Sequence, residues 1–168
     1  MKLIKAVIVM LILTSSTNVL AQKVKLKKGN VLVDGEQWLT YQDCGMFDGI
    51  CSLYNSSEEE IIFIKLVKVP GEEARTQSNP DGNLTYNEVI FLGKDLKYEI
   101  RGRTYKGIIS DLFNAKVVNE DGSLNDERID RLIEKLGTPY SDRLNNSTII
   151  IKESDNNSGS GVNIKIGN

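Results

Sequence analysis

The sequence of 168 residues contains no histidine, only two cysteines and only one tryptophan. Without histidine, the chain cannot form a Ser–His or Cys–His nucleophile pair, a histidine-ligated zinc site or an imidazole proton shuttle. Neither sign of charge is in large excess, because 21 Lys and Arg residues face 23 Asp and Glu residues, for a net charge of −2. This balance gives no global reason to expect nucleic acid as a partner. Enzymatic chemistry is therefore restricted to carboxylate, Ser/Thr, Lys or Tyr groups.

The apolar run near the N-terminus is too short to cross a bilayer. Residues 6–13 are all apolar, whereas a membrane-spanning helix takes about 20 residues. Lys2 and Lys5 precede this run, and Val19 and Ala21 fit the small-residue rule for cleavage before Gln22. We therefore expect residues 1–21 to be a signal peptide and the protein to be exported, periplasmic or secreted, with no membrane span in the mature chain. The alternative is an uncleaved N-terminal anchor.

Export changes the interpretation of the two cysteines. A pair of cysteines in an oxidising compartment predicts a disulfide between Cys44 and Cys51. A hairpin with a four-residue loop at 46–49 would place Gly45 opposite Ile50 and Cys44 directly opposite Cys51. The alternative, a redox-active pair, has less support because the spacing is not that of a C-x-x-C motif.

Met46 and Phe47 lie at the tip of this expected loop and are the candidate binding residues. Apolar side chains on a rigid loop are preorganised for binding a partner. The alternative is that they fold back onto the core. A second candidate is the lysine-rich segment 23–28, whose lysines either protect an edge strand from aggregation or contact anionic envelope polymers.

Alternating and β-branched apolar residues predict an antiparallel sheet in the first part of the chain. Turn dipeptides are expected at Gly29-Asn30 and at Asp34-Gly35, the latter typical of a type I′ hairpin. A polar loop is expected at residues 70–83. The expected strands are 23–28, 31–33, 36–41, 61–69, 88–92 and 96–100.

The periodicity then changes to that of helices. Thr104 is the expected N-cap of a first helix with a stripe of apolar residues, and Asn125 is the expected N-cap of a second. Gly137 is expected to end the second helix as a C′ glycine, and Pro139 prevents its continuation.

These elements predict one α+β domain over residues 22–152. We expect an antiparallel twisted sheet, two short C-terminal helices that cover one face of it, and a strand-forming tail. Residues 153–161 are expected to be a flexible connector, and residues 162–168 a C-terminal strand or arm. We expect the apolar faces of the two helices to pack against the sheet. The helix residues in this contact are Ile108, Leu112, Ile129, Leu132 and Ile133, and the sheet residues are Ile62, Ile64 and Val89.

No motif assigns a catalytic residue, a metal site or a cofactor. In the acidic segment 119–127, alignment on Gly122 as the sixth residue of an EF-hand loop puts Val117 and Arg128 at positions that must ligate calcium. The segment Ser158–Gly161 lacks the lysine and following helix of a P-loop, and no G-x-S-x-G sequence occurs. A two-carboxylate hydrolase needs only acids, and Asp43, Asp48 and Glu99 are the candidates for such a pair.

Three segments carry a resemblance to small exported bacterial proteins of unassigned function. They are the hairpin sequence 28–35, the strand sequence 87–91 and the helix-start sequence 122–133. The resemblance spans residues 23 to about 143 and implies a hairpin, a strand region and a short helical pair. It supplies no active site.

The function expected from the sequence is an exported, non-catalytic binding or envelope-associated domain. Its partner would be an envelope or extracellular protein or polymer. The alternatives are a small carboxylate-dependent hydrolase and a carrier whose sheet encloses an apolar ligand.

Overall fold

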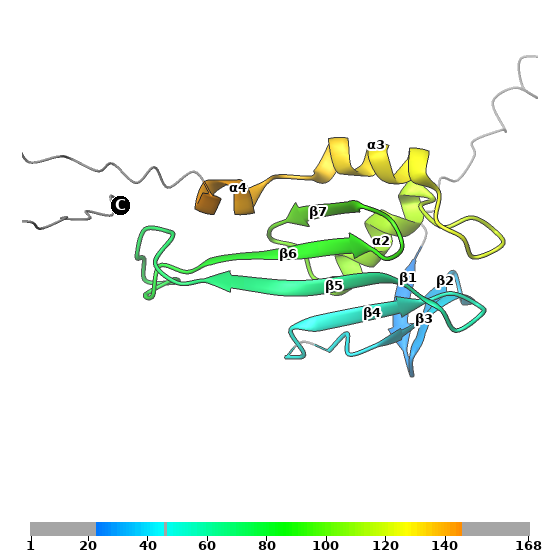
Figure 1. Ribbon diagram of the computed structural model, residues 1–168. Coiled ribbons are helices and arrows are strands. Elements are labelled where there is room, and N and C mark those ends of the chain that lie inside the picture. The colour runs from blue at the N-terminus through cyan, green and yellow to red at the C-terminus, as the bar shows by residue number, and fades with distance from the viewer. Residues whose placement is uncertain (1–22, 46, 146–168) are drawn as a thin grey trace, which may run out of the picture.

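The computed structural model describes residues 23–45 and 47–145. The expected signal peptide (1–21), the expected connector and arm (153–161 and 162–168) and Met46 lie outside the described residues. Within the described part, the chain forms a seven-stranded antiparallel sheet followed by three short helices, which is an α+β fold (Figure 1). The elements are β1 (Val24–Lys27), β2 (Asn30–Val33), β3 (Glu36–Gln42), β4 (Ile50–Tyr54), β5 (Glu60–Val69), β6 (Leu84–Phe91), β7 (Leu96–Ile100), α2 (Tyr105–Ala115), α3 (Asp126–Leu136) and α4 (Tyr140–Asn145).

The sheet is a meander in which each strand pairs with the next along the chain, in the order β1 to β7. The Asp34-Gly35 turn is confirmed: both residues have positive φ, 52° and 99°, as a type I′ turn requires. The first turn was expected one residue too late. Lys27 pairs with Asn30, so the turn residues are Lys28 and Gly29.

β6 begins earlier than the expected strand at 88–92. Leu84 pairs with Val69, and the ladder continues without a break to Ile62 and Phe91. The expected strand began too late because polar residues such as Asn87 interrupt the apolar pattern. The Asn87 amide is nevertheless buried, and it donates to the carbonyl of Arg103.

α2 packs on one face of the sheet. The Thr104 hydroxyl accepts a hydrogen bond from the Gly107 backbone, so the expected N-cap is confirmed. Ile108, Ile109 and Leu112 are fully buried, and they share one core with residues of the sheet that include Ile62 and Val89. Burial of each such side chain contributes about 1.5–3 kcal/mol, so this contact is a main source of stability.

The expectation that the two helices pack on one core with the sheet is confirmed, because Ile129 and Leu132 of α3 belong to the same buried cluster as Ile108 of α2. The third helix, α4, was not expected, and it lies on the other face. α3 lies beside β7 at the edge of the sheet, as Figure 1 shows. The Tyr140 ring, at the start of α4, stacks on the Tyr86 ring at 5.5 Å between centroids. Tyr86 and the core residue Val89 are three positions apart on β6, so their side chains point to opposite faces. The chain therefore runs from one face, around the β7 edge, to the other, because the turn at 137–139 redirects it.

Gly137 ends α3 for a reason other than the one expected. Its φ is −67°, so it is not the left-handed residue that usually follows a helix. A Cβ at this position would instead lie 2.6 Å from the Ile133 carbonyl oxygen and 3.4 Å from the Tyr98 Cβ. Glycine is needed here because the chain passes closely over the last turn of α3 and over β7.

Candidate functional site

The first candidate site is the loop between β3 and β4, whose two cysteines lie at disulfide-bonding distance. The Cα atoms of Cys44 and Cys51 are 4.3 Å apart, and the pair forms the disulfide. Within the loop, the Asp48 carboxylate accepts a hydrogen bond from the Gly45 backbone N–H at 2.6 Å. At its base, the Leu66 N–H donates to the Gly49 carbonyl at 2.7 Å. These three links hold both ends of the loop.

The register of this hairpin differs from the expected one. Gln42 pairs with Ser52, so simple continuation of the ladder would place Asp43, not Cys44, opposite Cys51. Asp43 instead has a φ of 52°, in the left-handed region. This residue bends the chain and brings Cys44, one position later, to Cys51. The spacing of the two cysteines in the sequence does not reveal that the β3 side of the loop holds one residue more than a simple hairpin would.

The large apolar side chains that remain exposed gather around this loop. Among the described residues they are Phe47, 95% exposed, Leu66, 48% exposed, and Ile50, 39% exposed. Phe47 therefore does not fold back onto the core, while Met46, its neighbour, lies outside the described residues. Ile50 pairs with Lys65, next to Leu66, so Ile50 and Leu66 flank the base of the loop on opposite faces of the sheet.

The loop also lies near the start of α2. Burial, together with the negative charge of Asp48, raises the pKa of Tyr105, the first residue of α2. Asp43 and Asp48 give the loop two exposed carboxylates beside its apolar tip.

A second cluster of functional groups lies on the sheet face opposite α2. The Glu88 carboxylate on β6 bridges two lysines, with one oxygen 2.5 Å from Lys65 Nζ on β5 and the other 2.6 Å from Lys97 Nζ on β7. Glu99 is opposite Glu88 in the β6–β7 register, and its carboxylate accepts a hydrogen bond from the Ser141 N–H at 2.8 Å. Both glutamates are buried, so cations or backbone donors are needed to compensate their charge.

The lysines control the ionisation of this cluster. Burial by itself raises the pKa of Glu88, but hydrogen bonds from Lys65 and Lys97 and their positive charges outweigh burial and lower the pKa below its ordinary value. Lys97 has a raised pKa because of its hydrogen bond to Glu88 and the charge of that carboxylate. A general acid of a hydrolase needs the opposite shift, a carboxyl that stays protonated near neutral pH.

The three acids considered for hydrolysis do not form one site. Asp43 and Asp48 are exposed in the disulfide loop, whereas Glu99 is buried beneath the start of α4. Among the described residues, no group of three or more Cys, Asp or Glu side chains is placed to hold a metal ion.

A third candidate is a hollow of about 780 Å³ between β3, the end of α2 and the loop that leads to α3. Trp38 and Phe113 form one wall, with their ring centroids 4.9 Å apart and their planes almost perpendicular. Asn55, a buried residue of the β4–β5 turn, donates from its amide to the Gly122 carbonyl. This bond fixes the loop on the sheet and so sets the opposite wall.

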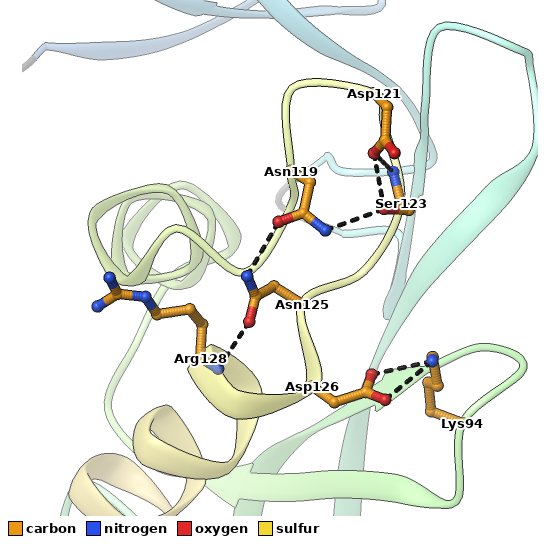
Figure 2. Close-up of polar contacts among 7 residues, drawn as sticks. All are labelled: Lys94, Asn119, Asp121, Ser123, Asn125, Asp126 and Arg128. Carbon is orange, nitrogen blue, oxygen red and sulfur yellow. Dashed lines mark hydrogen bonds and ion pairs between the residues drawn. The ribbon is translucent and has the colours of Figure 1, made fainter.

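Figure 2 shows how the loop before α3 is held by its own side chains. Asn119 donates to the Ser123 hydroxyl and accepts from the Asn125 amide, and Asn125 caps α3 by accepting from the Arg128 N–H at 3.1 Å. The Asp121 carboxylate accepts from both the N–H and the hydroxyl of Ser123, and these hydrogen bonds lower the pKa of Asp121. Of the acidic residues that suggested a calcium loop, Asp121 therefore holds the turn and Asp126 pairs with Lys94.

Sequence reasoning missed both the Glu88 cluster and the hollow beside Trp38. Each is assembled from elements that are distant in the sequence, so composition gave no sign of them. The sequence did contain one sign of a charged site on α3. Arg128, Arg131 and Lys135 recur with helical spacing, which places them on one side of the helix.

Within the described residues, no helix has both the length and the apolar character needed to cross a bilayer. The paired cysteines are compatible with an oxidising, exported location. Comparison of the chain with protein-family models, with curated proteins and with solved structures finds no match in any of the three.

Proposed function

We propose that this protein is an exported, non-catalytic binding domain that holds a protein partner through the disulfide-closed loop. The observation that carries the proposal is the 95% exposure of Phe47 on a loop fixed at both ends. An exposed aromatic ring is unfavourable in water, and a rigid loop loses little conformational entropy when a partner covers it.

The surroundings of Phe47 indicate what kind of surface the partner presents. Ile50 and Leu66 lie on opposite faces at the base of the loop, so only a partner that encloses the loop contacts all three side chains. Asp43 and Asp48 would repel an anionic bilayer, which argues against insertion of the loop into a membrane. The partner we propose is therefore an envelope or extracellular protein with an apolar pocket.

The two alternative functions have less support. A carrier needs an empty apolar cavity, but the sheet face that would enclose one is filled by Ile108, Ile109 and Leu112 of α2. A carboxylate-dependent hydrolase needs a proton donor, and the lowered pKa of Glu88 is the opposite of that property.

Capture of partners from envelope fractions tests the proposal. Wild type, Phe47→Ala and Phe47→Leu are used as bait, with Lys25→Ala on β1 as a distant surface control. We expect a specific protein to be retained by wild type and Lys25→Ala, retained in part by Phe47→Leu and lost with Phe47→Ala, because the leucine keeps an apolar side chain. Identical partners for Phe47→Ala and wild type would refute the role of the loop.

Export is tested separately by mass spectrometry of the protein recovered from the envelope or the medium. We expect the mature chain to begin at Gln22. Recovery of the chain with residues 1–21 still attached would contradict the proposed export.

A further inference from the structure

We infer that the groove between α2 and α3 is a binding site for an acidic glycan, separate from the Phe47 loop. The hollow beside Trp38 and a second hollow of about 370 Å³ between the two helices are both lined by Asn114 and Arg128. Because they share these residues, the two hollows are neighbours, and together they are called the groove here. Phe47 lines neither of them.

The charges of α3 are divided between its two flanks. Ile129 and Leu132 are buried and face the core, and the charged residues lie on either side of this stripe. Arg128, Arg131 and Lys135 follow one flank, which lines the groove. The opposite flank holds Asp130 and Glu134, which face Lys94 and Lys97 of the β6–β7 hairpin. Positive charge is thus concentrated on the groove side in a chain whose net charge is −2.

Several of these cations have no partner of opposite charge. Among the described residues, Lys116, Arg128 and Lys135 make no ion pair, whereas Arg131 is paired with Glu127 and Arg103 with Asp111. In Figure 2 the guanidinium of Arg128 points away from the hydrogen-bonded loop. Unpaired cations along one groove favour an anionic ligand, and arginine binds carboxylate or sulfate groups with two parallel hydrogen bonds.

The rest of the lining fits a sugar. Trp38 is half-buried against Phe113 and presents an apolar ring surface at one end of the groove. Gln37 and Asn114 add amides, which both donate and accept, as hydroxyl groups do. An aromatic wall with a few convergent polar groups is typical of a small-ligand site.

The charge density of the groove favours a glycan over a nucleic acid. Arg128 and Lys135 are seven residues apart, about 10 Å along the helix. A nucleic acid duplex places about six phosphate charges on such a length and is bound by a dense basic surface. Here Glu120 and Asp111 also line the groove, so the excess of positive charge is small. A sugar polymer whose carboxylates or sulfates are spaced apart matches this small positive excess better than a nucleic acid does.

Titration calorimetry on the full mature chain tests the inference. The probes are polygalacturonate oligosaccharides, sulfated dextran oligosaccharides, neutral dextran and oligo(dT). We expect one of the two acidic glycans to bind, with affinity that falls as salt is added, and neutral dextran to show no binding. Which acidic probe binds identifies the acid group. Binding of oligo(dT) more tightly than both acidic glycans would overturn the inference.

Charge-reversal variants locate the binding. Arg128→Glu and Lys135→Glu are compared with Lys68→Glu, which changes the net charge equally at an exposed position of β5, a strand that lines neither hollow. We expect the first two to raise the dissociation constant about tenfold or more, because each loses a charge-assisted hydrogen bond, and Lys68→Glu to change it less than about twofold. Arg128 and Lys135 are exposed, so we expect both variants to fold, which thermal melts will check.

Two results would overturn the inference. Equal weakening by Lys68→Glu would mean that the glycan responds to net charge and not to the groove, and absence of binding to both acidic probes would mean that there is no such site. Phe47→Ala is expected to leave glycan binding unchanged, so failure of the Phe47 proposal and failure of this one are distinguishable.

Discussion

Replacement of Glu88 by glutamine removes the negative charge that Lys65 and Lys97 share. The Glu88 side chain is 9% exposed, and it makes ion pairs of 2.5 and 2.6 Å. A hydrogen bond to a charged group contributes about 1.5–3 kcal/mol, and the amide of glutamine keeps part of one. The lysine side chains are 43% and 59% exposed, so they can turn to water and recover some of the loss. We expect Glu88→Gln to lower the free energy of unfolding at pH 7 by about 2 kcal/mol.

The loss depends on pH in a defined direction. The pKa of Glu88 is lowered in the folded protein from an ordinary value of 4.5. The stabilisation by the ionised carboxylate is therefore fully present above pH 4.5 and is lost as the pH falls through the lowered folded-state pKa. The difference between wild type and Glu88→Gln is expected to be constant near neutral pH and to disappear in acid.

Urea unfolding of wild type, Glu88→Gln and a matched surface control, each measured at several pH values from neutral to acid, checks this reasoning. The control is Glu127→Gln, which breaks the exposed ion pair with Arg131 and is expected to cost less than about 0.5 kcal/mol. Equal costs for the two variants would refute the role of burial at Glu88. A cost at Glu88 that persists unchanged below the folded-state pKa would refute the role of its charge.

Three further changes have expected outcomes. The double substitution Cys44→Ser with Cys51→Ser opens a short loop and is expected to cost about 2.5 kcal/mol by the chain-entropy relation; reducing agent should lower the urea midpoint of wild type but not that of the variant. Gly137→Ala places a Cβ 2.6 Å from the Ile133 carbonyl oxygen, and we expect a loss of about 1–3 kcal/mol in the same assay. Gly107→Ala meets only ordinary contacts, the nearest at 3.5 Å, and is expected to stabilise α2 by up to about 1 kcal/mol, so a destabilised protein would contradict the packing around that helix.

The elements with local signals were predicted well from the sequence. Asp34-Gly35 forms the expected turn, and Thr104 and Asn125 cap the expected helices. These features were predictable because each depends only on residues that are close together in the sequence. The disulfide partners were also identified, but not the bend at Asp43 that brings them together. A left-handed aspartate between a strand and a cysteine is a tertiary adjustment that no local pattern requires.

The parts that were missed depend on register and on long-range packing. Glu88 meets Lys65 and Lys97 only because three strands align at that level, and a shift by one residue would separate them. α4 is six residues long, too short for a clear apolar period, and its position is fixed by the Tyr86–Tyr140 stacking. The groove joins residues of β3, α2 and α3, which is why only its α3 flank was visible in the sequence.

The consecutive order of the strands has a consequence for how the chain folds. Each of the six strand pairings joins neighbours along the sequence, so the sheet can grow hairpin by hairpin, and each step closes only a short loop. The contact between β1 and α2 is different, because it joins segments about 80 residues apart and therefore closes a much longer loop than any hairpin does. We therefore expect this contact to form late in folding, after the hairpins, and substitutions at it to change the unfolding rate more than the folding rate.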